Sequence, residues 1–226
     1  MIIAIDGPAA AGKGTLAKRL AEHFELAYLD TGLIYRAVGK KMVDEGFNLE
    51  SIEKAESIAK ALSPVDLEIE GLRTDEVAQM ASKVSVIPGV RSALLEFQRS
   101  FAERPPAGKR GAVLDGRDIG TIVCPNANLK LFVTARTTIR AERRFKELQK
   151  RGLEAIYARV LGDIKERDAR DSSRATSPLE PASDAYQLDT STLDANQVFA
   201  KALEIVGAAG IGDIDPQGDE VQNEAL

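Results

Sequence analysis

The feature that most constrains this chain is a glycine-rich turn between a short apolar run and an amphipathic pattern near its start. Residues 2–5 read Ile-Ile-Ala-Ile, a buried-strand pattern, and residues 13–24 place apolar side chains four apart, which predicts a helix. Residues 7–15, where the two patterns meet, read Gly-Pro-Ala-Ala-Ala-Gly-Lys-Gly-Thr. A strand that enters a helix through such a turn predicts an α/β fold with a phosphate held at the start of the helix.

The turn fits the start of the phosphate-loop (P-loop) pattern, with one departure. Gly14 stands where Ser or Thr directly follows the lysine in the strict pattern, and Thr15 comes one residue later. Glycines let the backbone turn its N–H groups inward, and the new helix adds its positive end. We expect Lys13 to reach the outer phosphates of a triphosphate and the Thr15 hydroxyl to reach a phosphate or a Mg²⁺ ion. The predicted phosphate-binding set is Gly7, Pro8, Ala9, Ala10, Ala11, Gly12, Lys13, Gly14 and Thr15.

Short apolar runs alternate with helical patterns along the rest of the chain. After residues 2–5, strand patterns cover residues 27–29, 112–114, 129–133 and 185–188. Helical patterns cover residues 32–45 and 88–103, begin again near residue 137, and follow the capping candidates Thr192 and Asp194. Short strands separated by helices predict a three-layer α/β fold of the P-loop class, with a five-stranded parallel sheet and helices on both faces.

Composition and charge narrow the possible functions. The 226 residues hold 30 Lys and Arg against 35 Asp and Glu, a net charge of −5 that argues against a dedicated nucleic-acid binder. The single Cys124 excludes an internal disulfide, and the single His23, which we assign a structural role, excludes a multi-histidine zinc site. Because the chain lacks an apolar run of about 20 residues and a leader pattern, we predict a cytoplasmic protein without a membrane segment.

Arginines in turn-like places could form a second anion-binding site. Residues 30–36 read Asp-Thr-Gly-Leu-Ile-Tyr-Arg, residues 115–120 read Asp-Gly-Arg-Asp-Ile-Gly, and residues 167–174 contain three arginines. The first two segments follow strands, where ligands of open α/β sheets bind. Guanidinium groups stay charged and bind phosphate oxygens in pairs, so we place Arg36, Arg117 and Arg174 in this site. On the long basic helix we interpret Arg140, Arg143 and Arg144 as solvated surface charges.

Taken in order, these motifs resemble those of bacterial cytidylate kinases, in the nucleoside monophosphate kinase group of P-loop kinases. The resemblance runs from about residue 2 to residue 205 and includes the run from Pro178 to Ser191. It implies transfer of the γ-phosphoryl group of MgATP to CMP or dCMP, with Mg²⁺ held partly by Thr15. It also implies these roles: ATP binding at residues 7–15; phosphate clamping and catalysis by Lys13, Arg36, Arg117 and Arg174; cytosine recognition by Ser82, Arg91 and Asp118; ribose binding by Arg167 and Asp171; and a place beside the nucleotide for Thr31.

The resemblance also implies how one P-loop kinase domain is divided. We expect a core of residues 1–35 and 104–205, a monophosphate-binding segment of residues 36–103, and a lid at about residues 149–171. Many relatives have a small-sheet insertion, which is shortened here near residues 63–75, where residues 65–69 alternate like one strand. Residues 207–226 form an acidic tail that we expect to be disordered or loosely packed.

Other functions remain open on the residues alone. The nearest is a P-loop kinase for another acceptor, such as UMP, AMP or a small metabolite. A nucleotide-dependent switch would hydrolyse ATP or GTP slowly and would leave the arginine clusters unexplained. A nucleic-acid binder could use residues 136–174, which hold 12 Lys and Arg against 7 Asp and Glu. We favour the kinase, expect a monomer, and expect no nucleic-acid or membrane partner.

Overall fold

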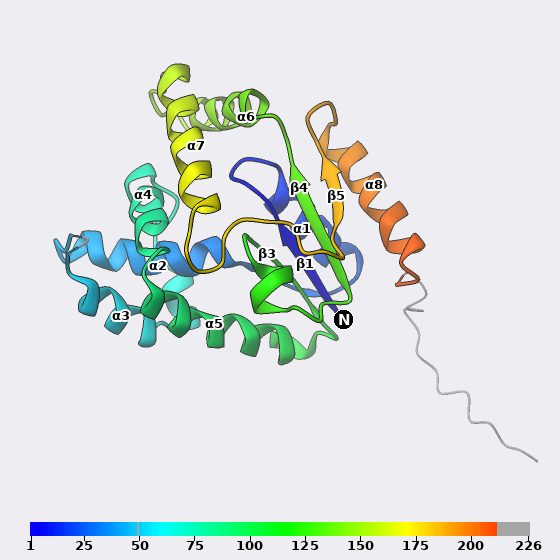
Figure 1. Ribbon diagram of the computed structural model, residues 1–226, viewed down its shortest axis with the longest axis horizontal. Helices are drawn as coiled ribbons and strands as arrows, with labels where there is room; N and C mark the ends of the chain where they lie inside the picture. Colours follow the sequence, from blue (N-terminus) through cyan, green and yellow to red (C-terminus); the bar gives the residue numbers. More distant parts are fainter. Residues whose placement is uncertain (49, 212–226) are drawn as a thin grey trace, which may run out of the picture.

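A five-stranded parallel sheet forms the centre of the molecule, as the sequence predicts. The computed structural model describes residues 1–48 and 50–211. The strands lie in the order β2-β3-β1-β4-β5 (Figure 1). Because all strands run in the same direction, their carboxyl ends meet at one edge of the sheet. Their bounds are β1 (Ile2–Asp6), β2 (Ala27–Asp30), β3 (Ala112–Gly116), β4 (Leu129–Thr134) and β5 (Tyr186–Asp189).

Helices cover both faces of the sheet, which confirms the predicted three layers. Ile3 and Ile5 of β1 point into one core, with α1 (Lys13–His23) and α8 (Ala195–Ala208). Ala4, the residue between them, points into the opposite core, with the α5 helix (Pro88–Glu103) and the short helix η3 (Ile119–Val123). This alternation is the two-residue period of a strand, and the apolar composition of β1 follows from its burial on both faces.

A group of helices beside the sheet forms a core of its own. It contains α2 (Thr31–Asp44), α3 (Ile52–Lys60) and α4 (Asp75–Val84), which lie to one side of the sheet in Figure 1, and α5, which runs from this group along the sheet. Ile34, Val38, Met42 and Leu94 are completely buried among these helices. This separate core holds α2 and α4 beside the carboxyl edge of the sheet.

Residues 65–69 do not form the strand that their alternation resembles, which answers a question that the sequence alone leaves open. The 3₁₀ helix η1 (Pro64–Glu68) occupies this place, and strand pairing is absent from the described residues 63–75. Pro64 stands at the first position of η1, where a fixed φ favours a helical turn. Ser63 and Asp66 form a reciprocal capping box, in which the Ser63 N–H donates to the Asp66 carboxylate at 2.8 Å. The local capping signal therefore prevails over the apolar alternation.

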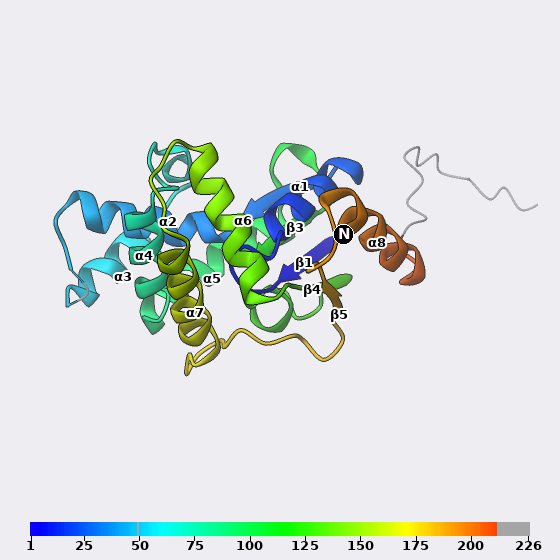
Figure 2. The ribbon, with the colours of Figure 1, turned by 90° about the horizontal axis from the view of Figure 1, so that it is seen from above.

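A two-helix hairpin projects beyond the carboxyl edge of the sheet. The helices are α6 (Thr137–Lys150) and α7 (Tyr157–Ser172), and Figure 2 shows them side by side. Leu148 of α6 packs with Val160 and Ile164 of α7. Within the described residues, we find no helix that is both long and apolar enough to cross a membrane.

For the elements that the sequence predicts, most bounds agree with the structure. The C-terminal part of the chain needs two adjustments. The last strand lies one residue later than expected, at Tyr186–Asp189, and Asp194 caps α8 by accepting from the N–H groups of Asn196 and Gln197. The tail was expected to start at Gly207, but α8 continues to Ala208. The remainder of the expected tail, residues 212–226, lies outside the described residues.

Candidate active site

The loop between β1 and α1 has the shape that its glycines permit. Gly7 and Gly12 have φ angles of 144° and 97°, which L side chains rarely adopt. A Cβ atom at Gly7 would lie 1.9 Å from the carbonyl oxygen of Val133 on β4, so only glycine fits between the two strands. The loop therefore curls tightly over the edge of the sheet, and α1 begins at Lys13 with its N-terminal N–H groups beside the loop.

Lys13 is a buried cation at the centre of this loop. Its Nζ donates to the Pro8 carbonyl oxygen at 2.9 Å, and its side chain is largely hidden from solvent. Burial, with the nearby positive charge of Arg117, lowers the pKa of Lys13 to about 7, although Asp115 and Asp6 oppose the shift. An anion bound in the loop would restore the charge, so the loop is adapted to a phosphate group.

Asp6, at the end of β1, connects the loop region to the segment after β3. Its carboxylate accepts hydrogen bonds from the N–H groups of Ile119 and Gly120 at 2.8 and 2.7 Å. Burial raises the pKa of Asp6 to about 6, and the two N–H groups counteract that effect. Asp6 thus holds the turn that presents Arg117 and Asp118, a role that the sequence analysis did not assign.

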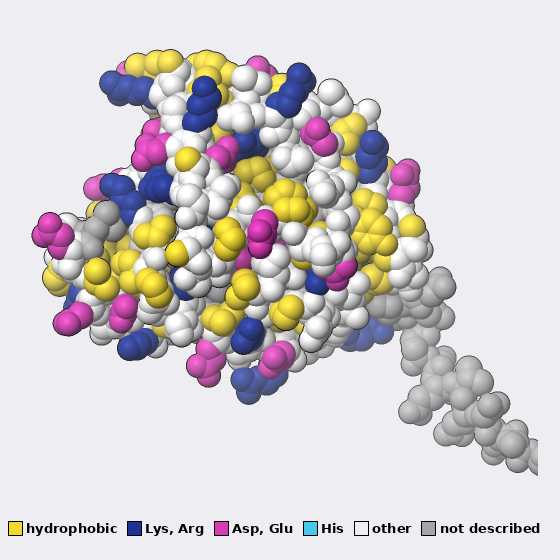
Figure 3. All heavy atoms as spheres, in the orientation of Figure 1, with side chains coloured by type: hydrophobic (Ala, Val, Ile, Leu, Met, Phe, Trp, Pro, Cys, Tyr) yellow, Lys and Arg dark blue, Asp and Glu magenta, His cyan; other side chains and the backbone are white. Residues whose placement is uncertain are grey.

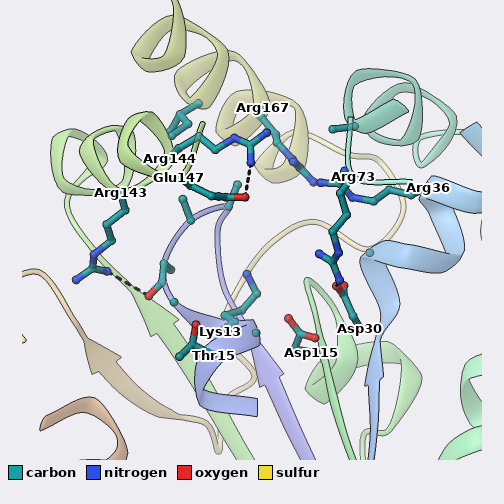
Figure 4. Close-up of a pocket in the computed structure, with 18 of the residues that line it drawn as sticks. Lys13, Thr15, Asp30, Arg36, Arg73, Asp115, Arg143, Arg144, Glu147 and Arg167 are labelled. Atoms are coloured by element: carbon teal, nitrogen blue, oxygen red, sulfur yellow. Dashed lines mark hydrogen bonds and ion pairs between the residues drawn. The ribbon is translucent and has the colours of Figure 1, made fainter. Parts of the chain in front are cut away.

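One cavity of about 540 Å³ opens at this edge of the sheet (Figure 4). The phosphate loop forms its floor, while α2 and α4 border one side and α6 and α7 border another. Its charged lining residues are Lys13, Lys18, Arg36, Arg73, Arg117, Arg143, Arg144 and Arg167 against Asp30, Asp75, Asp115, Glu147 and Asp163. Cations therefore outnumber anions by eight to five in the cavity lining, whereas Figure 3 shows charges of both signs interspersed over the visible face.

Arginines from two helices, α2 and α7, face the phosphate loop. Arg36 of α2 donates to the Leu72 carbonyl oxygen at 3.1 Å, and burial lowers its pKa. Arg167 of α7 is also buried, and burial together with the charge of Arg117 lowers its pKa. Figure 4 shows Arg36 and Arg167 on the side of the cavity opposite Lys13. Cations that are desolvated together in this way favour an anionic ligand.

Asp171 joins three of the predicted arginines. Its side chain is 1% exposed and accepts from Arg117 Nε at 2.8 Å and from Arg174, while Arg167 Nε lies 3.9 Å away. Although burial disfavours the carboxylate, Arg117 and Arg174 outweigh it and lower the pKa of Asp171. Asp171 therefore orients the arginines, and its expected ribose contact stays a prediction.

The residues expected to recognise cytosine lie together in a buried group. Arg91 of α5 and Asp118 form an ion pair at 2.5 Å, and both are more than nine-tenths buried. Ser85 connects the group, since its carbonyl accepts from Arg91 and its hydroxyl accepts from Arg174. Ser82 of α4 is also buried, with 4% of its surface exposed. The atoms Ser82 Oγ, Arg91 Nε and Arg174 Nε are buried without a hydrogen-bond partner among the described residues, which indicates a polar ligand.

The predicted residues therefore fall into two neighbouring sets. Residues 9–15, Arg36, Arg117 and Arg167 line the cavity. The second set is buried and meets the first through Asp171 and Arg117. Thr31 is 3% exposed and donates to the Asp115 carbonyl oxygen at 2.8 Å, and its expected place beside the nucleotide stays a prediction. The members of the second set are Ser82, Arg91, Asp118, Asp171 and Arg174.

The interpretation of Arg140, Arg143 and Arg144 as solvated surface charges is wrong. Arg140 is 4% exposed and pairs with Asp168 of α7 at 2.6 Å. Arg143 donates to the Thr190 hydroxyl at 2.8 Å, and Arg144 reaches Asp75 of α4 across the cavity. A helix pattern shows which residues share a face, but it does not show that a second helix and a cavity cover that face. Arg73 and Ser85 were also missed, because no spacing or motif distinguished them.

The fold and the site define the class of protein. A parallel sheet whose first strand leads through a glycine loop and a buried lysine into a helix is the P-loop nucleotide-binding fold. A solved structure of an uncharacterized protein from Eubacterium ventriosum shares the fold, with a TM-score of 0.51 and 14% identity over 92% of this chain and 99% of that one.

The family follows from the sequence comparisons. The family model described as cytidylate kinase matches residues 3–208, and the chain belongs to this family. It is 64% identical to a cytidylate kinase of Paramagnetospirillum magneticum, over 92% of this chain and 98% of the relative. It is 55% identical to one of Methylocella silvestris, over 92% and 95%, and 53% identical to one of Rhodospirillum rubrum, over 91% and 97%.

Proposed function

We propose that the protein transfers the γ-phosphoryl group of ATP to CMP or dCMP, giving ADP and CDP or dCDP. The observation that carries this proposal is a cavity with Lys13 and the phosphate loop on one side, Arg36 and Arg167 on the opposite side, and Arg117 also in its lining. Two anion-binding walls that face each other can hold a donor and an acceptor phosphate. Membership in the cytidylate kinase family supports cytidine monophosphates as the acceptors.

The site performs the transfer by positioning and by neutralising charge. The ATP phosphates lie on residues 7–15, where the loop N–H groups and the start of α1 bind them. Arg36 and Arg117 hold the acceptor phosphate in line with the γ-phosphate, with Asp171 fixing Arg117 through Arg117 Nε. Fixed cations reduce the repulsion between two polyanions, and phosphoryl transfer needs little covalent chemistry from the protein.

Asp118, Arg91 and Ser82 recognise the base. Cytosine presents an amino donor at N4 and acceptors at N3 and O2. The Asp118 carboxylate accepts from N4, while Arg91 Nε and Ser82 Oγ, which are buried without partners among the described residues, donate to the acceptors. Uracil carries a carbonyl oxygen at position 4, which would face the Asp118 carboxylate. That carbonyl oxygen and the carboxylate oxygen opposite it would then both lack a hydrogen-bond donor.

Thr15 and Asp115 provide oxygen donors that fit Mg²⁺. Both side chains line the cavity beside Lys13. A hydroxyl and a carboxylate are the hard ligands that Mg²⁺ prefers, and kinase sites use few protein ligands because phosphates and water supply the rest. When bound there, Mg²⁺ would neutralise charge on the outer phosphates of ATP.

The expected lid, at about residues 149–171, covers the end of α6 and most of α7; we extend it to the whole hairpin of α6 and α7, and α2–α5 act as the acceptor segment. Arg144 of α6 pairs with Asp75 of α4, and Arg170 of α7 donates to Gln79 of α4 at 3.3 Å. These contacts join the lid to the acceptor segment across the cavity. Closure of the two parts over the nucleotides would exclude water and protect ATP from hydrolysis.

A coupled assay of ADP release tests the function directly. MgATP is offered with CMP, dCMP, UMP, AMP or no acceptor. We expect rapid release with CMP and dCMP and turnover with UMP lower by about 100-fold, because uracil leaves buried polar groups unpaired.

The other outcomes separate the alternatives. Equal turnover with UMP or AMP would keep the phosphate site and contradict the roles of Asp118, Arg91 and Ser82. Slow release that ignores every acceptor would contradict the kinase function and support a nucleotide-dependent switch.

ATP binding is expected to take up a proton at Lys13. In the free protein the pKa of Lys13 is lowered to about 7, so near pH 8 the amine is mostly neutral. A bound triphosphate raises that pKa again, so binding consumes close to one proton, and ATP affinity falls as the pH rises above about 7. Titration calorimetry in buffers of different ionisation enthalpy measures the uptake. Lys13→Arg keeps the charge at every such pH and should abolish the uptake, and an unchanged uptake in this variant would assign it to another group.

A further inference from the structure

Tyr28 of β2 contacts a carboxylate at the edge of the phosphate loop. Its hydroxyl donates to Asp115 Oδ1 at 2.9 Å, from one strand to its neighbour. Within residues 1–48 and 50–211, this hydroxyl is the only hydrogen-bond donor that reaches the Asp115 carboxylate. Thr31 donates to the backbone oxygen of Asp115, and Lys13 Nζ donates to Pro8, so neither fixes the orientation of this carboxylate.

The pair lies directly against the loop at Gly14. A Cβ atom built on Gly14 would be 3.5 Å from the Tyr28 hydroxyl and 3.7 Å from Asp115 Oδ2. The two oxygens of Asp115 are therefore used differently, since Oδ1 is held by Tyr28 and Oδ2 lies by Gly14. Tyr28, Asp115, Lys13 and Thr15 all line the same cavity, and Figure 4 shows Asp115 beside Lys13.

The surroundings of Asp115 disfavour the negative charge of its carboxylate. Its side chain is buried, and the carboxylate of Asp30, the last residue of the neighbouring strand β2, repels its charge. Arg73 pairs with Asp30 at 3.0 Å. Lys18 Nζ lies 5.9 Å from the centre of the Tyr28 ring, and the Tyr28 hydroxyl donates to Asp115.

We propose that Tyr28 is a positioning residue for metal-bound ATP, because its hydroxyl holds Asp115 with Oδ2 turned toward the phosphate loop. The proposal rests on the placement of ATP and Mg²⁺ in the proposed function. A carboxylate anchored through one oxygen has already lost rotational freedom, so its other oxygen would bind a metal ion at a lower entropic cost. In this proposal Tyr28 acts through Asp115 and is not itself a metal ligand.

Calorimetric titration of Tyr28→Phe with ATP, in the presence and absence of Mg²⁺ and without any acceptor, tests the proposal. The variant loses one oxygen and keeps the ring that packs beside α1. We expect the factor by which Mg²⁺ strengthens ATP binding to fall about 10-fold, as for the loss of other groups that orient metal ligands. We expect ATP binding without Mg²⁺ to be unchanged. Tyr186→Phe, at a half-exposed tyrosine of β5, is the matched control and should leave both affinities unchanged.

A double-mutant cycle with Asp115→Asn distinguishes positioning from a general structural effect. If Tyr28 acts through Asp115, adding Tyr28→Phe to Asp115→Asn should cause no further loss of the Mg²⁺ effect. An unchanged Mg²⁺ effect in Tyr28→Phe, an equal loss in the Asp115→Asn background, or ATP binding by the original chain that ignores Mg²⁺ would each overturn the proposal. Failure of the kinase function would appear separately, as acceptor-independent ADP release in the coupled assay.

Discussion

Arg117→Ala is expected to lower kcat with CMP by about 10³-fold, the effect of removing a cation that stabilises a transferring phosphoryl group. Arg117 lines the cavity, and its Nε is held by Asp171 at 2.8 Å, so its guanidinium is fixed before substrates arrive. Although burial disfavours its charge, Asp171 outweighs that effect and raises the pKa of Arg117. Steady-state kinetics with CMP measures the loss.

Arg117→Ala should also lower the stability of the protein, because Arg117 is a buried partner of Asp171 as well as a catalytic cation. Asp171 keeps Arg174 as a partner but loses one buried ion pair, so we expect the free energy of unfolding to fall by about 1–3 kcal/mol, measured by urea denaturation. Arg104→Ala, at an arginine that follows α5 and bonds only to Ser100 within the described residues, is the control and should change neither quantity by much. Near-normal turnover of Arg117→Ala would contradict its place in the clamp.

Lys13→Met is expected to reduce kcat/KM for ATP by about 10²–10³-fold, because it removes the cation that meets the outer phosphates. The stability of the protein, unlike its catalytic efficiency, should not fall. Burial lowers the pKa of Lys13, and its Nζ makes one hydrogen bond, to Pro8, so an uncharged side chain of similar length relieves an unfavourable burial. We expect a melting temperature equal to or above that of the original chain, measured by thermal denaturation.

The matched control for this experiment is Lys165→Met, at an exposed position of α7. It should leave both kcat/KM and the melting temperature nearly unchanged. A Lys13→Met variant that retained full activity would show that the loop N–H groups suffice, while one that unfolded would show that Lys13 supports the fold. Either result would contradict a site in which stability is given up for phosphate binding.

Local signals in the sequence determined the framework of the protein. The five apolar runs formed the five strands of a parallel sheet, and the glycines at 7 and 12 adopted the backbone angles that the loop requires. The phosphate-loop lysine and two of the three chosen arginines, Arg36 and Arg117, line the cavity. These features were predictable because each depends on a few adjacent residues: a strand period, a turn or a helix start.

Only the tertiary structure decided which distant side chains meet. Arg144 and Asp75, 69 positions apart, face each other across the cavity, and Tyr28 reaches Asp115, 87 positions away. Periodicity placed Arg144 on a charged helix face, but the folding of α7 and α4 against that region made it part of the site. Likewise, the buried partners of Asp171 depend on α7 returning to the segment after β3. The sequence pattern carries local geometry, whereas burial and pairing are properties of elements brought together by packing, and no local pattern encodes them.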